Sequence, residues 1–253
     1  MMKKADDVMD ICLLAGDIMM KYGAETYRVE ETLERMAKAA SFTNVHCFAT
    51  TTGIFLSFEE KKGKDDMMQM IRIDDRMQDL SKVTDVNQVS REFVAGELTV
   101  EEARLKLLEI ADAPMQYPLW LIHLAAGFAG GGFSYLFGGG WFDLLPAFIA
   151  ALVSSIVVVE FERYLKVRFA AEFAAAFSGG TVAIFLVYIG LGTNIDQIII
   201  GSLMPLVPGV ALTNAVRDLM SGDLLAGVTR GAEALLTSLS IASGIALTIS
   251  IFL

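Results

Sequence analysis

The pattern of apolar and polar positions changes character part-way along the chain. Up to about residue 113, apolar residues recur at helical or alternating spacing among many charged ones, and from Pro118 onward long apolar stretches are joined by short links. Residues 1–117 hold 37 of the 50 charged side chains. The pattern therefore predicts two domains, a small α+β domain at 1–113 and a membrane domain at 114–253.

The first domain reads as two helices, three strands and two more helices. Apolar residues at three- and four-residue spacing predict helices at 3–22 and 25–41, and Gly23 is placed to end the first. Alternating runs predict strands at 45–51, 53–59 and 67–73, with turns at 50–53 and 61–66. A third helix at 77–95 ends before Gly96, and Thr99 with Glu102 forms a capping-box pattern that starts the fourth.

The second domain reads as an all-α bundle of five transmembrane helices. Apolar stretches long enough to cross a bilayer cover 119–137, 141–159, 173–190 and 227–253, and another begins at 195–204. Gly127 and Gly131 have the G-x-x-x-G spacing that lets membrane helices approach closely. Residues 160–172 are expected to form a charged loop between the second and third spans.

One span is predicted to be interrupted. Pro205 and Pro208 lie three residues apart and Gly209 follows, so a helix that reaches Met204 should break there and restart near Gly209. A restarted helix presents free N–H groups and partial positive charge at its N-terminus. Many transporters bind anionic solutes at such breaks.

Polar residues after the break form the candidate substrate site. Asn214, Arg217 and Asp218 follow on the restarted helix, and the last span begins a polar stripe with Arg230 and Glu233. Ionisable groups at membrane depth are costly and usually functional. Three of the carboxylates, Asp218, Asp223 and Glu233, are candidate proton carriers. Two plainer interpretations remain open: Arg230 and Glu233 pair with each other, or the restarted helix is a solvated cytoplasmic loop.

The charged segment near the start of the chain has two interpretations as well. Glu25, Arg28 and Glu30 belong to a helix dense in charge. They form either a solvated helix face with pairs four residues apart, or a gate or contact surface for the membrane domain.

Composition narrows the class of function and the location. The net charge of −10 argues against nucleic-acid binding. The first residues contain four aspartates where a signal peptide needs an apolar run, and Lys and Arg concentrate in the loop at 160–172. Together these predict a multi-pass protein of the plasma (inner) membrane, with the N-terminal domain in the cytoplasm and the C-terminus outside. Two histidines and two separated cysteines predict no metal site, and no cofactor is expected.

Three segments of the chain resemble the bacterial threonine/serine exporter family. They are GDIMMKYGAETYRVEETLERMA, ATTTGIFLSF and PLVPGVALTNAVRDLMSGDLLAGVTRGAEAL, spread over the full length. The resemblance implies a soluble N-terminal domain, five spans, and efflux of threonine and serine or of a dicarboxylate such as succinate. Longer members look like this chain fused to a second five-span half. We therefore expect the chain to work with a separate small membrane subunit, as in the split two-subunit form, or as a homo-oligomer.

The predicted function is that of a subunit in a secondary-active exporter of small carboxylate-bearing metabolites. There is no G-x-x-x-x-G-K-[ST] sequence for ATP binding, so an ion gradient would drive export. One alternative is a membrane-embedded hydrolase, for which aspartates are available but the G-x-G-D pattern is missing. Another is a membrane sensor with a cytoplasmic signalling domain.

Overall fold

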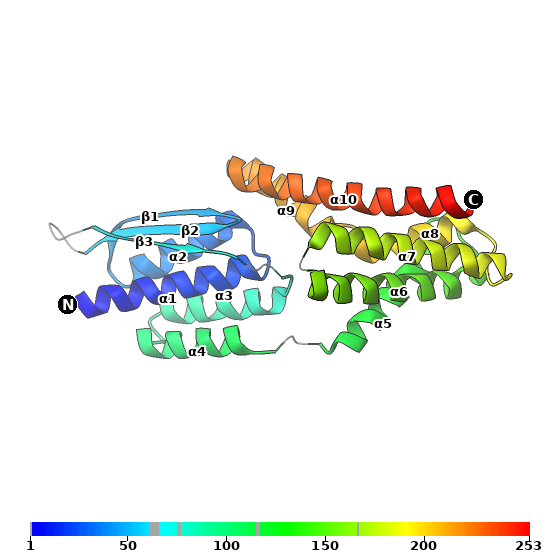
Figure 1. Ribbon diagram of the computed structural model, residues 1–253. Helices are drawn as coiled ribbons and strands as arrows, with labels where there is room; N and C mark the ends of the chain where they lie inside the picture. Colours follow the sequence, from blue (N-terminus) through cyan, green and yellow to red (C-terminus); the bar gives the residue numbers. More distant parts are fainter. Residues whose placement is uncertain (1, 61–65, 75–76, 115–116, 166) are drawn as a thin grey trace. The chain divides into compact units, whose positions relative to one another are not determined.

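The computed structural model describes residues 2–60, 66–74, 77–114, 117–165 and 167–253 (Figure 1). The chain divides into two compact units. The first unit contains 1–116 together with 213–231, and the second contains 117–212 together with 232–253. Most of the predicted turn at 61–66, the middle of the predicted linker at 115–116, and Lys166 lie outside the described residues.

Helices and strands follow the predicted order in the first unit. The bounds are α1 Met2–Lys21, α2 Thr26–Ala39, β1 Thr43–Thr50, β2 Gly53–Glu59, β3 Asp66–Arg72, α3 Leu80–Val94 and α4 Val100–Asp112. The strands form one antiparallel sheet in the order β1-β2-β3. Thr50 pairs with Gly53, so the first hairpin turns within 51–52 as the threonine and glycine residues indicate.

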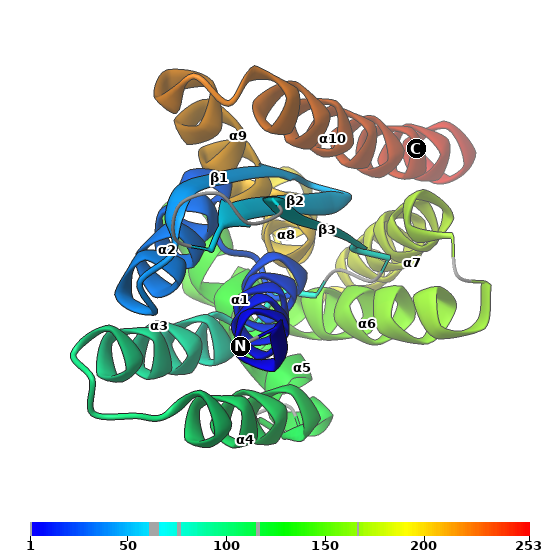
Figure 2. The ribbon, with the colours of Figure 1, turned by 90° about the vertical axis from the view of Figure 1, so that its left-hand side faces the viewer.

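Three layers make up this part of the first unit. One face of the sheet covers α1 and α2, and α3 and α4 lie on the other side of α1 (Figures 1 and 2). The core is built from large apolar side chains, among them Met9, Ile18, Leu33, Leu56 and Phe58, each at most 1% exposed. Burial of side chains this large stabilises a small domain by the hydrophobic effect.

Sequence signals set the helix ends in this unit. Gly23 and Gly96 have φ of +98° and +77°, the left-handed conformation that glycine adopts without steric cost just past a helix. Thr99 accepts a hydrogen bond from the Glu102 amide, and the Glu102 carboxylate accepts one from the Thr99 amide. This capping box starts α4 as predicted.

The remaining elements are helical. They are α5 Leu119–Leu136, α6 Trp141–Leu165, α7 Arg168–Tyr188, α8 Ile195–Leu203, the 3₁₀ turn η1 Met204–Leu206, α9 Gly209–Ser221 and α10 Leu224–Phe252. The predicted loop at 160–172 is wrong, because α6 continues to Leu165 and α7 starts at Arg168. That segment contains neither proline nor glycine, so most of it can be helical, up to Leu165 and again from Arg168, with its charged side chains extending from the two helix ends.

Four helices are long and apolar enough to cross a membrane: α5, α6 through Tyr164, α7 and α10. The segments Ile195–Leu206 and Gly209–Ser221 pass the same test as a pair, bent by 58°, which makes up to five spans in the described part of the chain. The break matches the prediction at Pro205, Pro208 and Gly209. Val207 is extended because the ring of Pro208 excludes the helical conformation from the residue before it.

Small residues form the contacts between helices in the second unit. A Cβ added to Gly130 would collide with Ala151 and lie 2.9 Å from the Gly201 carbonyl oxygen. A Cβ on Gly244 would lie 3.0 Å from the Phe177 amide nitrogen. These helix backbones approach each other too closely for larger side chains. Close backbone contact through small residues is typical of associating membrane helices.

Candidate functional site

A short loop between α1 and α2 is the centre of the polar network that contains most of the predicted site residues. The Asp79 amide donates to the Tyr22 carbonyl oxygen at 3.2 Å, and the Met77 amide donates to the Lys21 carbonyl oxygen at 2.7 Å. The ammonium of Lys82, which is buried, donates to the Tyr22 hydroxyl at 3.2 Å. These bonds hold the residues just before the loop against the N-terminal end of α3.

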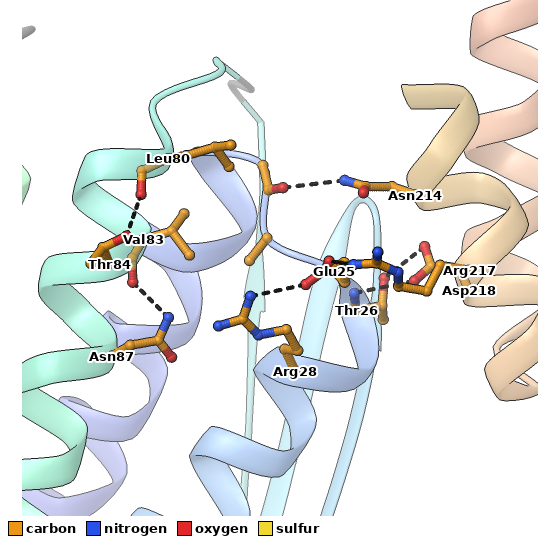
Figure 3. A network of polar contacts seen from close by, with 12 residues as sticks. Glu25, Thr26, Arg28, Leu80, Val83, Thr84, Asn87, Asn214, Arg217 and Asp218 are labelled. Carbon is orange, nitrogen blue, oxygen red and sulfur yellow. Dashed lines mark hydrogen bonds and ion pairs between the residues drawn. The ribbon is translucent and has the colours of Figure 1, made fainter. Parts of the chain in front are cut away.

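The α2 helix begins without a capping side chain of its own. Glu25 occupies the N-cap position and makes no side-chain cap bond. Asp218, from α9, accepts from the Thr26 amide at 3.3 Å and from the Thr26 hydroxyl at 3.4 Å (Figure 3). A carboxylate distant in sequence thus satisfies a free N–H group at this helix start, where the helix dipole also favours negative charge.

Arg230 completes the environment of that carboxylate. Its Nε lies 3.2 Å from Asp218 Oδ2, and both side chains are buried, 10% and 0% exposed. Another guanidinium nitrogen donates to the Ala24 carbonyl oxygen at 2.8 Å. The pair is compensated by further hydrogen bonds on both sides, which is the condition for a buried ion pair to be tolerated.

A second set of contacts lies beside the first. Arg217 pairs with Glu25, which also accepts from Arg28 at 3.2 Å, and Asn214 donates to the Gly23 carbonyl oxygen at 3.3 Å (Figure 3). Glu25 is 8% exposed. The structure therefore brings four of the predicted substrate residues, Asn214, Arg217, Asp218 and Arg230, onto the loop at 23–26.

Other predicted residues lie elsewhere. Glu30 accepts from the Ala49 amide at 2.7 Å, and burial raises the pKa of this carboxyl, with the negative charge of Asp223 adding to the effect. Burial likewise raises the pKa of Asp223, which lies between α9 and α10. Glu233 is partly buried and belongs to the second unit, as do Pro205, Pro208 and Gly209.

The polar stripe on α10 makes helix contacts in the second unit. Thr237 donates to Glu172 at 3.1 Å, and Thr248 donates to the Phe177 carbonyl oxygen at 3.1 Å. Both threonines are at most 1% exposed. These two threonines of α10 therefore join it to α7.

The sequence reasoning missed the role of Asp143. Its carboxylate is fully buried and accepts from the Gly140 amide at 2.8 Å, the Thr193 amide at 2.7 Å and the Asn194 side chain at 2.7 Å. It ties the turn before α6 to the turn before α8. An acid in the first turn of a helix was the one visible signal, because its partners Thr193 and Asn194 are 50 and 51 residues away.

The described residues include no group of three or more His, Cys, Asp or Glu side chains that could hold a metal ion. Burial raises the pKa of Cys12 to about 12, so this thiol is not a reactive nucleophile at neutral pH. The arrangement around Thr26 can bind a carboxylate, because Arg230 and the N-terminus of α2 both face the same position.

Comparison with known proteins agrees with a transport role. The sequence model of the family described as "Putative threonine/serine exporter" matches residues 10–252. The chain belongs to the threonine/serine exporter family. The relatives described below are named as exporters or as a transporter subunit, and none of these names is that of an enzyme.

Three relatives show two different lengths. A "Probable threonine/serine exporter" of Mycobacterium tuberculosis is 25% identical over 96% of this chain and 46% of its own length. The "Threonine/serine exporter" of Corynebacterium glutamicum is 25% identical over 96% and 51%. The "Probable succinate transporter subunit YjjP" of Escherichia coli is 24% identical over 96% and 93%. The chain thus spans about half of the two exporters and nearly all of the subunit.

No solved structure matches this exporter-family chain. Family membership and the apolar helices make it a multi-pass membrane protein.

Proposed function

We propose that this chain is one subunit of a secondary-active exporter of small carboxylate-bearing metabolites, either threonine and serine or a dicarboxylate such as succinate. The observation that carries the proposal is the position of Asp218, whose carboxylate is held by the start of α2 and by Arg230. It supports a site built for a carboxylate, directly after the broken helix.

In the proposed mechanism, the carboxylate of the solute takes the place of Asp218. The donors would be the Thr26 amide and hydroxyl and the Arg230 guanidinium, all of which bond to Asp218 in its absence. Arg217, paired with Glu25, offers a second cation and Asn214 a neutral donor. Exchange of one carboxylate for another leaves no buried arginine unpaired, which keeps the cost of opening the site low.

Ion coupling would use the carboxylates that the exchange releases. Asp218, Asp223 and Glu233 are the candidate carriers, and displacement of Asp218 from Arg230 would free it to take up a proton. Glu25, Arg28 and Glu30 would act as the contact that senses or gates this exchange, because Glu25 pairs with Arg217.

The placement in the membrane and the partner are also proposals. We propose that residues 1–113 lie in the cytoplasm and that the C-terminus lies outside, in the plasma (inner) membrane. The relative that matches this chain along nearly its whole length is named a transporter subunit. That match supports a second small membrane subunit, or a second copy of this chain, as the partner.

The test is solute efflux from proteoliposomes that contain the chain and its candidate partner. Labelled threonine or succinate is loaded, and unlabelled amino acids and dicarboxylates are tested as competitors. Arg217→Gln should reduce efflux at least tenfold, because a charge-assisted hydrogen bond is worth about 1.5–3 kcal/mol. Arg163→Gln, at an exposed position on α6, is the matched control and should transport normally.

Arg230 needs a different variant, because its loss alone would leave Asp218 buried without a cation. The double variant Arg230→Gln with Asp218→Asn removes both charges and should fold without transporting. Efflux at the wild-type rate in a folded double variant would refute the proposed site. Absence of efflux from the wild-type chain with every partner would refute the exporter itself.

A further inference from the structure

A basic groove runs between α2 and α3 in the first unit. It has a volume of about 370 Å³, within the range of small-molecule sites. Three arginines line it, Arg28 and Arg35 from α2 and Arg91 from α3, with the hydrogen-bonding side chains of Thr32, Asn87 and Ser90 between them.

The charge of this groove is opposite to that of its surroundings. Residues 1–117 contain 15 Lys and Arg against 22 Asp and Glu. The groove has three arginines against one acid, Glu31. A local positive potential on an acidic surface attracts small anions and repels cations.

The three arginines differ in whether they already form an ion pair with a carboxylate. Arg35 pairs with Glu31, and Arg28 pairs with Glu25 at 3.2 Å. Arg91 is exposed and forms no ion pair with any carboxylate in the described part of the chain. The charge of the Arg91 guanidinium is therefore uncompensated, and Asn87 and Ser90 lie beside it on the α3 side of the groove.

We propose that this groove is a binding site for a small oxyanion, bearing carboxylate or phosphate groups, and that it is separate from the solute site around Arg230. Guanidinium groups bind both kinds of oxyanion through paired N–H donors. Arg91 supplies the free cation and Arg28 the second. The Thr32 hydroxyl and the second N–H of the Asn87 side chain are the neutral donors, because the other Asn87 N–H donates to Val83 and the Ser90 hydroxyl donates to the Asn87 carbonyl oxygen.

Arg28 connects the groove to the loop at 23–26. Its guanidinium bonds to Glu25, and Glu25 also pairs with Arg217 of α9; Figure 3 shows Arg28 with this partner and Asn87 on the neighbouring helix. An anion in the groove competes with Glu25 for Arg28. Binding of an anion therefore weakens the Arg28–Glu25 ion pair and leaves Glu25 to pair with Arg217 alone. In this way the groove can regulate the contacts of the loop at 23–26.

The experiment measures binding, so it does not depend on transport. The purified full chain in detergent is titrated with succinate in one arm and inorganic phosphate in the other, by isothermal titration calorimetry at low salt. We expect at least one of them to bind, and the two arms tell a carboxylate ligand from a phosphate ligand. Affinity should fall as NaCl is raised, since exposed charges are screened.

Variants separate the groove from the solute site and from general charge. Arg91→Gln should weaken binding about tenfold or more, and Arg91→Lys should weaken it less. Arg104→Gln, which removes an exposed arginine of α4 outside the groove, should bind like the wild type. The double variant at Arg230 and Asp218 should also retain this binding, because the two sites are separate.

Two results would overturn the inference. One is the lack of binding by either anion up to about 10 mM, ten times a Kd of about 1 mM. The other is equal affinity in wild type and Arg91→Gln, with an unchanged melting temperature showing that the variant is folded. Neither result would refute the exporter proposal, which is tested by efflux from the chain together with its partner.

Discussion

The two units bury opposite kinds of side chain. The first unit has a core of large apolar residues such as Met9, Leu33 and Phe58. The second unit buries alanines, glycines and serines between its helices, while Trp120, Phe142 and many other large apolar residues are exposed. Water drives large apolar groups inward, whereas lipid leaves them outside and favours close backbone contact. The exposed apolar side chains of the second unit agree with its helices being apolar enough to cross a membrane.

Phe58→Ala tests the first half of this comparison and should have the largest effect. Phe58 is 1% exposed and packs against Phe42, with ring centroids 4.3 Å apart and the rings tilted by 36°. Its truncation should cost about 3–5 kcal/mol of the free energy of unfolding. Met68→Ala on β3, where the side chain is 65% exposed, is the control and should cost almost nothing. Thermal unfolding followed by circular dichroism compares them.

Asp143→Ala tests whether the second unit depends on buried polar bonds. The change leaves the amides of Gly140, Thr193 and Asn194 without their acceptor. It should cost about 3 kcal/mol, measured by thermal unfolding in detergent. Asp196→Ala removes an exposed acid from the start of α8 and should leave the melting temperature nearly unchanged. Equal changes of the melting temperature in Asp143→Ala and Asp196→Ala would contradict a stabilising role for the buried bonds of Asp143.

Gly130→Ala tests the close helix contacts directly. The added methyl group would collide with Ala151 and approach the Gly201 carbonyl oxygen, which backbone packing cannot easily move. We expect a loss of about 1–3 kcal/mol. At Gly132 a Cβ meets nothing within 4 Å, so Gly132→Ala should be neutral or slightly stabilising. If Gly130→Ala were as stable as Gly132→Ala, close packing at Gly130 would not be what holds these helices together.

Glu30→Gln should have the smallest effect, and the effect should depend on pH. Burial raises the pKa of Glu30 in the folded chain, so the stability tied to its protonated form is present at low pH and lost as pH rises through the folded pKa. Glutamine keeps the acceptor for the Ala49 amide without the charge. The variant should be a few tenths of a kcal/mol more stable at neutral pH, since the group is only partly buried, and should match wild type in acid.

Periodicity and punctuation in the sequence predicted most of the fold. Gly23, Gly96 and the Thr99 capping box mark helix ends by local backbone chemistry, which needs no partner. Pro205, Pro208 and Gly209 mark the broken helix for the same reason. The loop expected at 160–172 was wrong because charge alone does not end a helix; a proline or glycine would have been the stronger signal.

The candidate site was predicted in part. Asn214, Arg217, Asp218 and Arg230 were singled out as costly polar residues in an apolar region, and the structure brings them together. Their partners on the loop at 23–26 lie 191 to 206 residues away in sequence, so no spacing could have shown them. Asp143 was missed for the same reason.

The sequence by itself determined which segments are helices, which of them are apolar enough for a membrane, and where one of them breaks, because these depend on neighbouring residues along the chain. Only the tertiary structure decided that Asp218 caps α2 and pairs with Arg230, and that Arg28, Arg35 and Arg91 share a groove. Those contacts depend on distance in space, which a one-dimensional pattern does not contain.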